Sequence, residues 1–282
     1  MGTSSLRSLF FYALHKTSST RIRDGLNQYC IKEKLDCFAP EMNYKFCPRI
    51  AQNVTPAHCR QQLEHWVDYG TSTLARIRHC CAAFERHKFD ALIGHLKMND
   101  PLTAAWAANA FKTPPFRLTM IRTPAEVFES YFHNLPYYQY MKGMPFEDLV
   151  DALYEARFQG RQLDKGLEKW DHLLVNSQSK EMGWDGKTEE SFHQVLQTLA
   201  SFDFVGVSEY SLQSIGALEL ALGWPHKFLK HYGNRTMTMY KHDAAIRYKI
   251  LLLQDKDRRL YDFAKKLFMQ CHRFPFDPLN EK

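Results

Sequence analysis

Residues 8–20 read SLFFYALHKTSST, and this segment sets the architecture that we expect for the chain. Its first half, Ser8 to Leu14, is an apolar run with the length of a buried strand. Its second half holds a lysine and four hydroxyl residues, and a helix is expected to run from this cluster through Leu26 to Cys30. A buried strand that passes through a polar turn into a helix is typical of a parallel sheet covered by helices.

Three later segments have the same short, apolar character and alternate with helical patterns. They are expected to be strands at residues 90–95 (DALIGH), 116–121 (FRLTMI) and 204–207 (FVGV). We therefore predict an α/β protein with a three-layer, P-loop-like fold, in which helices flank a central parallel sheet, and a single domain over residues 1–282. Such sheets bind ligands beyond the carboxyl ends of their strands, so the residues just after each strand are the informative ones.

The remaining segments are predicted from helical spacing and from turn residues. Thr123, Pro124 and Glu126 form a capping-box pattern that starts a helix ending near Asn134. An irregular segment is expected at residues 34–56. Helices are expected at residues 56–84, 101–111, 146–200 with a break around 176–186, 212–222, and 243–271 as two helices.

The turn at residues 15–20 has the chemistry of a phosphate site. A helix N-terminus offers free backbone N–H groups to an anion, hydroxyls add hydrogen bonds, and Lys16 adds a mobile positive charge. The turn is not a Walker loop, since the pattern GxxxxGK[ST] is absent and no glycine precedes Gly25. A P-loop-like nucleotide-binding kinase is therefore disfavoured but stays an alternative, and so does an ordinary polar loop that caps a helix.

The motif LHKTSST after an apolar strand resembles the 5′-phosphosulfate loop of Golgi-type carbohydrate sulfotransferases, in particular the galactose 3-O- and hexuronyl 2-O-sulfotransferase families. The resemblance implies the sulfotransferase fold, with 3′-phosphoadenylyl sulfate (PAPS) as sulfuryl donor and adenosine 3′,5′-bisphosphate (PAP) as product. It implies that Lys16 contacts the bridging and sulfonate oxygens and is catalytic. It also places four hydroxyl residues around the phosphosulfate: Thr17, Ser18, Ser19 and Thr20.

A second motif, IRTP at residues 121–124 followed by FESYF at 128–132, resembles the 3′-phosphate element of the same families. The resemblance implies that Arg122 and Ser130 hold the 3′-phosphate of the donor. A guanidinium suits this role because it donates two parallel hydrogen bonds to one phosphate. The alternative is that Arg122 pairs with Glu126 and that Ser130 is an ordinary helix residue.

The families' general base is a histidine that follows a short apolar strand, and here that position is His95, in LIGHL. A histidine suits the role because its unperturbed pKa lies near neutrality. The resemblance therefore implies that His95 takes the proton of the acceptor hydroxyl. His15, His133 and Glu129 are rival candidates.

Weaker similarities to the galactose 3-O-sulfotransferases occur in NSQ at residues 176–178, MGW at 182–184 and FDFVGVSEY at 202–210. For any one of these residues, helix packing or loop capping explains the pattern as well as ligand contact does.

Composition and charge limit the classes of ligand and partner that we expect for the protein. The net charge of +6, from 37 basic and 31 acidic residues, fits a polyanionic ligand, whereas the lack of a dense Lys/Arg run argues against nucleic acid. No run of about 18 uncharged apolar residues is present, and the N-terminal apolar run looks like a strand, so we expect no membrane span and a cytoplasmic protein. The Golgi lumen is the alternative if the sequence is a piece of a longer enzyme.

The seven cysteines match neither a zinc site nor a disulfide framework, so core thiols in a reducing compartment are expected. No metal is expected in the reaction. The resemblance of the two motifs implies a sulfotransferase, and the lack of a membrane span favours a hydroxyl or amine of a small-molecule acceptor. A galactosyl or uronyl glycan is the alternative acceptor.

Overall fold

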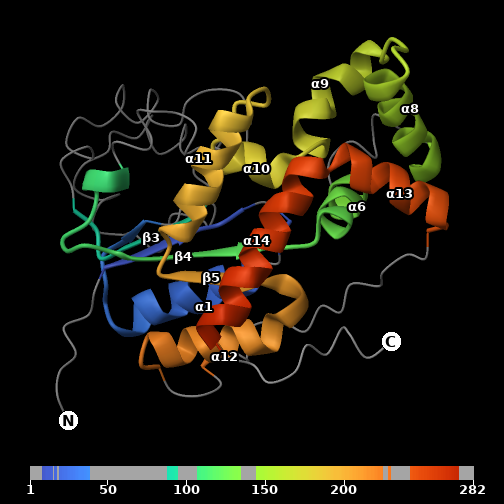
Figure 1. Ribbon diagram of the computed structural model, residues 1–282. Helices are drawn as coiled ribbons and strands as arrows, with labels where there is room; N and C mark the ends of the chain where they lie inside the picture. Colours follow the sequence, from blue (N-terminus) through green and yellow to red (C-terminus); the bar gives the residue numbers. More distant parts are fainter. Residues whose placement is uncertain are drawn as a thin grey trace, which may run out of the picture.

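The structure is a computed structural model of the chain, and it describes residues 8–14, 16–17, 19–38, 88–94, 107–134, 144–224, 228–229 and 242–272. Five parallel strands form one sheet in the order β2-β3-β1-β4-β5 (Figure 1). The strands are β1 (Leu9–Tyr12), β2 (Cys37–Phe38), β3 (Ala91–Gly94), β4 (Phe116–Ile121) and β5 (Phe204–Val207). The predicted α/β fold with a central parallel sheet is confirmed. The prediction of a single domain stays a prediction.

Helices lie on both faces of the sheet, as the predicted three-layer arrangement requires (Figure 1). The helices are α1 (Ser19–Lys32), α6 (Pro124–Asn134), α8 (Phe146–Phe158), α9 (Lys165–Leu174), α10 (Ser177–Glu181), α11 (Glu189–Ala200), α12 (Ser211–Ala221), α13 (Ala244–Leu253) and α14 (Asp255–His272), with a 3-10 turn at Ser208–Tyr210. The predicted helices after β1 and β4, the one at 212–222 and the pair at 243–271 are confirmed. Helix α10 lies inside the break that was expected at 176–186.

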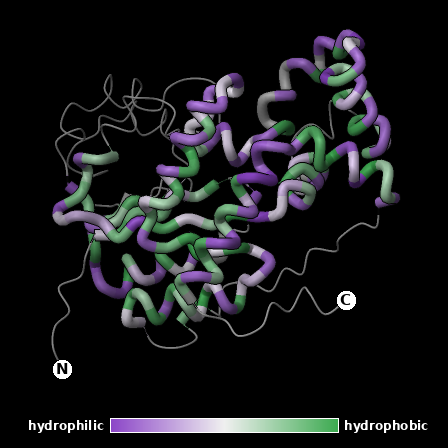
Figure 2. Tube along the Cα trace, in the orientation of Figure 1, coloured by the Kyte–Doolittle hydropathy of each residue, from purple (hydrophilic) through white to green (hydrophobic). Residues whose placement is uncertain are grey.

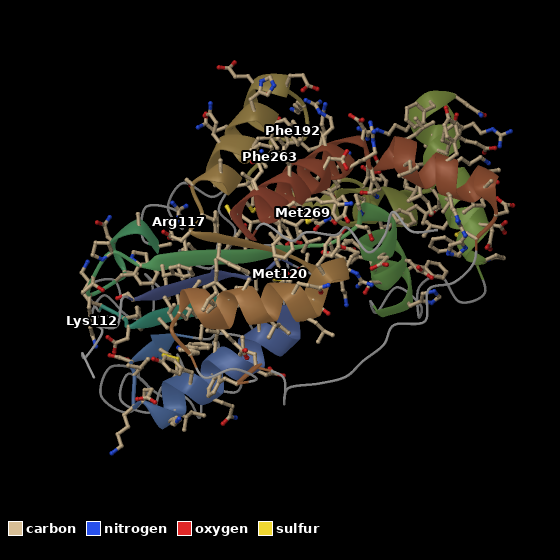
Figure 3. All side chains as sticks on the ribbon, turned by 60° about the horizontal axis from the view of Figure 1, so that its bottom comes forward. Lys112, Arg117, Met120, Phe192, Phe263 and Met269 are labelled. Atoms are coloured by element: carbon tan, nitrogen blue, oxygen red, sulfur yellow. A yellow bond between two sulfur atoms is a disulfide. The ribbon has the colours of Figure 1, made fainter. Side chains whose placement is uncertain are left out.

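The central strands are buried on both faces because their side chains alternate between two apolar clusters. Phe10 and Tyr12 of β1 pack with residues of α11 and α14, whereas Leu9 and Phe11 pack with residues of α1 and α12. Side chains point to opposite faces in turn along a strand, so a continuous apolar run such as LFFY can fill both layers. Figure 2 shows the hydrophobic residues gathered in the sheet and on the inner sides of these helices. In Figure 3, Phe192 and Phe263 lie on the side of α11 and α14, and Met120 lies toward α12.

A third cluster belongs to the helices that follow β4. Helices α6, α8, α9 and α13 pack around Phe128, Phe132, Phe146, Leu149 and Ile250. This helical lobe lies to one side of the sheet in Figure 1. It is held mainly by apolar contact, and its first helix begins at the carboxyl end of β4.

The expectation that all cysteines are core thiols is wrong for Cys30 and Cys37, which form a disulfide, and for Cys271, a free thiol that is exposed. The chain leaves α1 at Lys32 and turns back through Lys34, whose φ of 54° is in the left-handed region. This reversal brings the two Cα atoms to 6.3 Å, a separation that a disulfide spans. The same reversal starts β2 inside the segment that was expected to be irregular.

Several sequence predictions lie wholly or partly outside the described residues. The predicted helix at 56–84 and most of the irregular segment at 34–56 belong to this group. For the predicted helix at 101–111, the structure describes a helical turn at 107–109.

Candidate functional site

The carboxyl edge of the sheet contains a topological switch point. From β1 the chain runs to the β2 side of the sheet, and from β4 it runs toward β5 on the other side, although β1 and β4 are hydrogen-bonded neighbours. The two connections diverge, and in open α/β sheets the crevice at such a point is the usual ligand site. The predicted phosphate turn follows β1 and Arg122 follows β4, so both predicted anion contacts lie at this point.

The turn after β1 is tight, and it combines an internal hydrogen bond with bonds from distant residues. Lys16 has a φ of 62°, a left-handed conformation that is uncommon for a residue with a side chain. Thr17 is fully buried, and its hydroxyl donates to the carbonyl of Leu14 at 3.0 Å. From the end of β5, the Ser208 hydroxyl donates to the Thr17 carbonyl at 2.6 Å. Helix α1 follows with no acidic residue in its first turn, so no carboxylate of that turn competes with an anion for the helix N-terminus.

Arg122 joins the loop after β4 to this turn. Its Nη1 donates to the Lys16 carbonyl at 3.0 Å, and its Nε pairs with Glu126 Oε2 at 2.8 Å. Arg122 is only 4% exposed. The pairing with Glu126, which was the alternative interpretation, therefore exists, and it aims the guanidinium along the phosphate turn. The role of Arg122 as a 3′-phosphate contact stays a prediction.

The two cations are close enough to affect one another electrostatically. Burial lowers the pKa of Lys16 from its usual value, and the positive charge of Arg122 lowers it further. Both effects penalise an isolated ammonium, so an anion placed between the two cations would relieve them. The carboxyl edge of β1 and β4 thus holds two basic side chains within electrostatic range of one another.

Two carboxylates contact the start of the loop after β4, Glu126 at Arg122 and Glu209 at Thr123. Glu209 accepts the Thr123 N–H at 2.7 Å, and burial, with a smaller effect from Glu126, raises its pKa. The predicted capping box is wrong in its carboxylate, because Arg122 draws the Glu126 side chain to itself. Glu209, distant in sequence, supplies the missing acceptor for Thr123.

Lys16 also lies near Tyr131, which, like Tyr12, contacts Glu181. The Lys16 Nζ lies 6.0 Å from the centroid of the Tyr131 ring, and the Tyr131 hydroxyl donates to Glu181 Oε1 at 2.9 Å. The Tyr12 hydroxyl donates to the main-chain carbonyl of Glu181. The end of β1 is thereby tied to α10, a helix whose Gln178 also contacts Arg122.

The other predicted donor contacts are placed as follows. Ser130 is buried on α6, two turns after Arg122, and Ser19 and Thr20 open α1. Ser18 and the side chains of Ser19 and Thr20 lie outside the part of the chain that the structure describes. The roles predicted for these residues and for Thr17 stay predictions, although the Thr17 hydroxyl proton is donated to Leu14 here.

The candidate bases are divided between two regions. His95 and His15 fall outside the described residues. Glu129 is buried in the helical lobe with its Oε1 3.5 Å from His242 Nε2. His133 is exposed on the same helix, with its ring against Phe132. Assignment of the base therefore stays a prediction.

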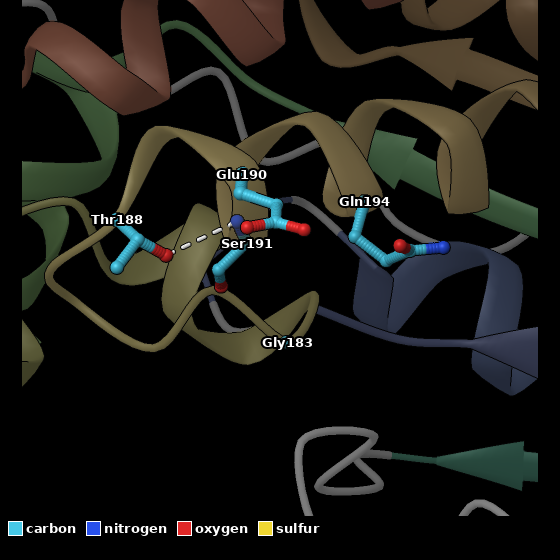
Figure 4. A pocket seen from close by; sticks show the side chains of 5 residues that line it. All are labelled: Gly183, Thr188, Glu190, Ser191 and Gln194. Atoms are coloured by element: carbon cyan, nitrogen blue, oxygen red, sulfur yellow. Dashed lines mark hydrogen bonds between the residues drawn. The ribbon is translucent and has the colours of Figure 1, made fainter.

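A surface pocket of about 340 Å³ lies away from these residues, at the start of α11 (Figure 4). Its lining consists of Gly183, Thr188, Glu190, Ser191 and Gln194. Thr188 caps α11 by accepting the Ser191 N–H at 3.1 Å. No residue predicted to bind the donor contributes to this pocket.

The described ranges give a finding on metals and one on membranes. Within those ranges, no three His, Cys, Asp or Glu side chains gather as metal ligands would. None of the helices in the same ranges is both long and apolar enough to cross a membrane. A metal-free reaction stays a prediction.

Sequence comparison finds no matching protein-family model and no significant match among curated proteins. Among solved structures, the chain is similar to a crystal structure of a sulfotransferase from Alicyclobacillus acidocaldarius. The TM-score is 0.46 and the sequence identity is 14%, over 95% of this chain and 99% of that chain. A likeness of this degree carries no argument about function, which has to come from the residues at the sheet edge.

Proposed function

We propose that this protein is a sulfotransferase that transfers a sulfuryl group from PAPS to a hydroxyl, or an amine, of an acceptor. The observation that carries the proposal is the hydrogen bond of 3.0 Å from Arg122 Nη1 to the Lys16 carbonyl. It joins the two motifs that resemble the donor-binding elements of carbohydrate sulfotransferases, although they lie about a hundred residues apart. The joint occurrence of both motifs at one switch point supports the proposal better than either motif alone.

The residues present fit an anionic donor. Lys16 and Arg122 lie near a helix whose first turn holds no acidic residue, and burial and the charge of Arg122 lower the pKa of Lys16. In this scheme Lys16 and the main chain of the turn hold the phosphosulfate. Arg122 and Ser130 hold the 3′-phosphate.

When bound, PAPS supplies a sulfuryl group whose sulfur forms a bond to the acceptor oxygen while its bond to the bridging phosphate oxygen breaks and PAP leaves. The task of Lys16 is to keep positive charge beside that bridging oxygen, where negative charge develops. The task of His95 is to take the acceptor proton. Arg122 holds the turn in place by donating a hydrogen bond to the Lys16 carbonyl.

The disulfide favours a particular version of this function. Disulfides such as Cys30–Cys37 form and persist in oxidising compartments and are rare in the cytosol. This feature favours the Golgi-type alternative, with a galactosyl or uronyl glycan as acceptor, over a cytoplasmic enzyme with a small-molecule acceptor.

A binding screen tests the proposal first. PAP, PAPS and ATP are titrated against the purified protein by calorimetry and thermal shift, and PAP at 100 times its Kd should add about 2.7 kcal/mol to the unfolding free energy. Acceptor profiling with labelled PAPS follows, comparing glycans with phenols and amines. Binding of ATP without binding of PAP would overturn the proposal and favour the kinase-like alternative.

A further inference from the structure

Gln178 makes an unusual pair of contacts with the residue that joins the two loops. Its Oε1 accepts the main-chain N–H of Arg122 at 3.0 Å, and its Nε2 donates to the main-chain carbonyl of Arg122 at 2.9 Å. Both groups belong to the same residue, so the side chain restrains the backbone on both sides of the Arg122 Cα. Gln178 is 1% exposed, so water does not compete for these bonds.

The carboxamide takes the place of a neighbouring strand. Strand β4 pairs with β5 up to Ile121, which lies opposite Val207, and beyond that point β5 turns into the 3-10 helix at Ser208. The next residue along the chain is Arg122. Its main-chain N–H and carbonyl would lack hydrogen-bond partners from a neighbouring strand. A glutamine carboxamide has the same donor and acceptor as a peptide group, so Gln178 extends the pairing by one residue.

Gln178 is itself held in place by a reciprocal pair of helix caps. The N–H groups of Gln178 and Ser179 donate to the two carboxylate oxygens of Asp257, at 3.0 and 2.7 Å. In return, Asn176 Oδ1 accepts the N–H groups of Lys256 and Asp257, at 2.9 and 3.1 Å. The starts of α10 and α14 therefore hold one another in place. We call the two bonds from the Gln178 carboxamide to the Arg122 main chain the clamp, and these helix contacts keep Gln178 in position to form it.

Gln254 belongs to the same network but does not contact Arg122. Its Oε1 accepts the Asn176 N–H at 2.9 Å, and its Nε2 donates to the Leu174 carbonyl at 2.6 Å. It is 1% exposed, as Gln178 is. The two glutamines thus have equal burial and equal hydrogen-bond chemistry, and they differ in whether their carboxamide reaches the loop after β4.

We propose that Gln178 is a positioning residue for the donor site, because its carboxamide fixes the main chain of Arg122 so that the guanidinium stays bonded to the phosphate turn. This proposal rests on the proposed function. It adds to it a residue from α10, a part of the chain in which sequence similarity gave no role. Gln178 acts through Arg122 and is not assigned a contact with the donor.

The test compares Gln178→Leu with Gln254→Leu, each of which removes one buried carboxamide. Four quantities are measured well below the midpoint of thermal unfolding: the Kd for PAP, kcat, KM for PAPS, and amide hydrogen exchange in the peptide that contains Arg122. We expect both variants to lose stability. We expect Gln178→Leu alone to raise the Kd for PAP and the KM for PAPS at least tenfold, and to speed exchange at Arg122. Gln178→Asn, which withdraws the carboxamide by one methylene and keeps the site polar, serves as a milder variant if Gln178→Leu does not fold.

A Kd for PAP in Gln178→Leu equal to that of the wild type would overturn the proposal, since the clamp would then be purely structural. Absence of PAP binding by the wild-type protein would instead overturn the proposed function. In that case hydrogen exchange still decides on the clamp: faster exchange at Arg122 in the Gln178 variant alone supports it, and unchanged exchange contradicts it.

Discussion

The chain leaves β1 and β4 in two different ways, although the two strands are neighbours in the sheet. The turn after β1, which we call self-closed, has an internal bond from the Thr17 hydroxyl to Leu14 beside the left-handed Lys16, and Arg122 and Ser208 bond its carbonyls from outside. The loop after β4 is held from outside, by Gln178 on Arg122 and by Glu209 on Thr123. Part of the shape of the first connection is set by its own residues. The shape of the second, which we call the borrowed loop, is set by side chains from α10 and from the end of β5.

The difference shows how an anion site can be both built and adjusted. A turn with an internal hydrogen bond keeps part of its shape without help from distant residues, so it suits the part of a ligand that stays constant. A loop held by distant side chains responds to changes in those helices. Within the proposed function, the turn after β1 would carry the chemistry and the loop after β4 would set the affinity.

The largest effect is expected from Lys16→Ala, which removes the charge from the self-closed turn. We expect kcat to fall by about 10²–10³, because stabilisation of developing negative charge is lost. Sulfuryl transfer from labelled PAPS measures this. Lys16→Arg is the control, since it keeps a positive charge on the same turn and should retain more activity than alanine. Unchanged turnover in the alanine variant would remove Lys16 from the mechanism.

The sequence predicted the self-closed turn after β1 well, whereas it predicted the contacts of the loop after β4 poorly. The run LFFY and the polar cluster after it are adjacent in the chain, so a local pattern predicts a strand, a turn and a helix, and the structure has all three. Glu126 was expected to cap Thr123 because it has the correct local spacing. The structure gives that contact to Glu209, 86 residues away.

Contacts that lie far apart in sequence explain what local patterns could not supply. The partners of Arg122 include Gln178 and the Lys16 carbonyl, which lie 56 and 106 residues away along the chain. Seven residues separate Cys30 from Cys37, but the reversal through the left-handed Lys34 is set by where α1 stops and β2 pairs. Burial and pairing decide these features, and a single sequence does not display them.

The next effect in size is expected from Arg122→Ala, which breaks the link between the two connections. Removal of one partner of a largely buried ion pair leaves Glu126 unpaired, so the unfolding free energy should fall by about 3–5 kcal/mol. The Kd for PAP should rise at least tenfold. Urea unfolding and calorimetry measure the two effects.

A double variant separates the fold from the site. Arg122→Met with Glu126→Gln removes both charges, so most of the lost stability should return while PAP binding stays weak. Recovery of PAP affinity in the double variant would show that the guanidinium is a structural group and not a donor contact.

A smaller effect is expected at Asp257, which anchors the borrowed loop through α10. Burial raises the pKa of Asp257 from 3.8 to about 6. The folded protein therefore binds more protons than the unfolded chain between about pH 4 and pH 6. The contribution of Asp257 to stability is full below that range and is lost as the pH rises through it, by up to about 3 kcal/mol.

Asp257→Asn should remove this dependence, because an amide stays neutral. We expect the variant to be less stable than the wild type near pH 4, because its amide nitrogen cannot accept the N–H of Gln178 or Ser179, and to lack the wild-type loss of stability between pH 4 and pH 6, as measured by urea unfolding across this range. Asp255→Asn, at an exposed position in the same turn of α14, should leave the slope as it is. Parallel stability curves for wild type and Asp257→Asn would contradict the assignment.

The smallest effect is expected from Thr17→Val, which removes the internal hydrogen bond of the self-closed turn and keeps a side chain of similar size. The hydroxyl donates to Leu14 at 3.0 Å, so its removal should lower the unfolding free energy by about 1 kcal/mol. If the hydroxyl closes the turn and the main chain binds the donor, the Kd for PAP should rise less than about threefold, and Thr17→Ser should restore stability. A tenfold loss of PAP affinity with unchanged stability would mean that the hydroxyl leaves Leu14 and contacts the phosphosulfate. The turn after β1 would then be rebuilt by its ligand, and the contrast with the borrowed loop would disappear.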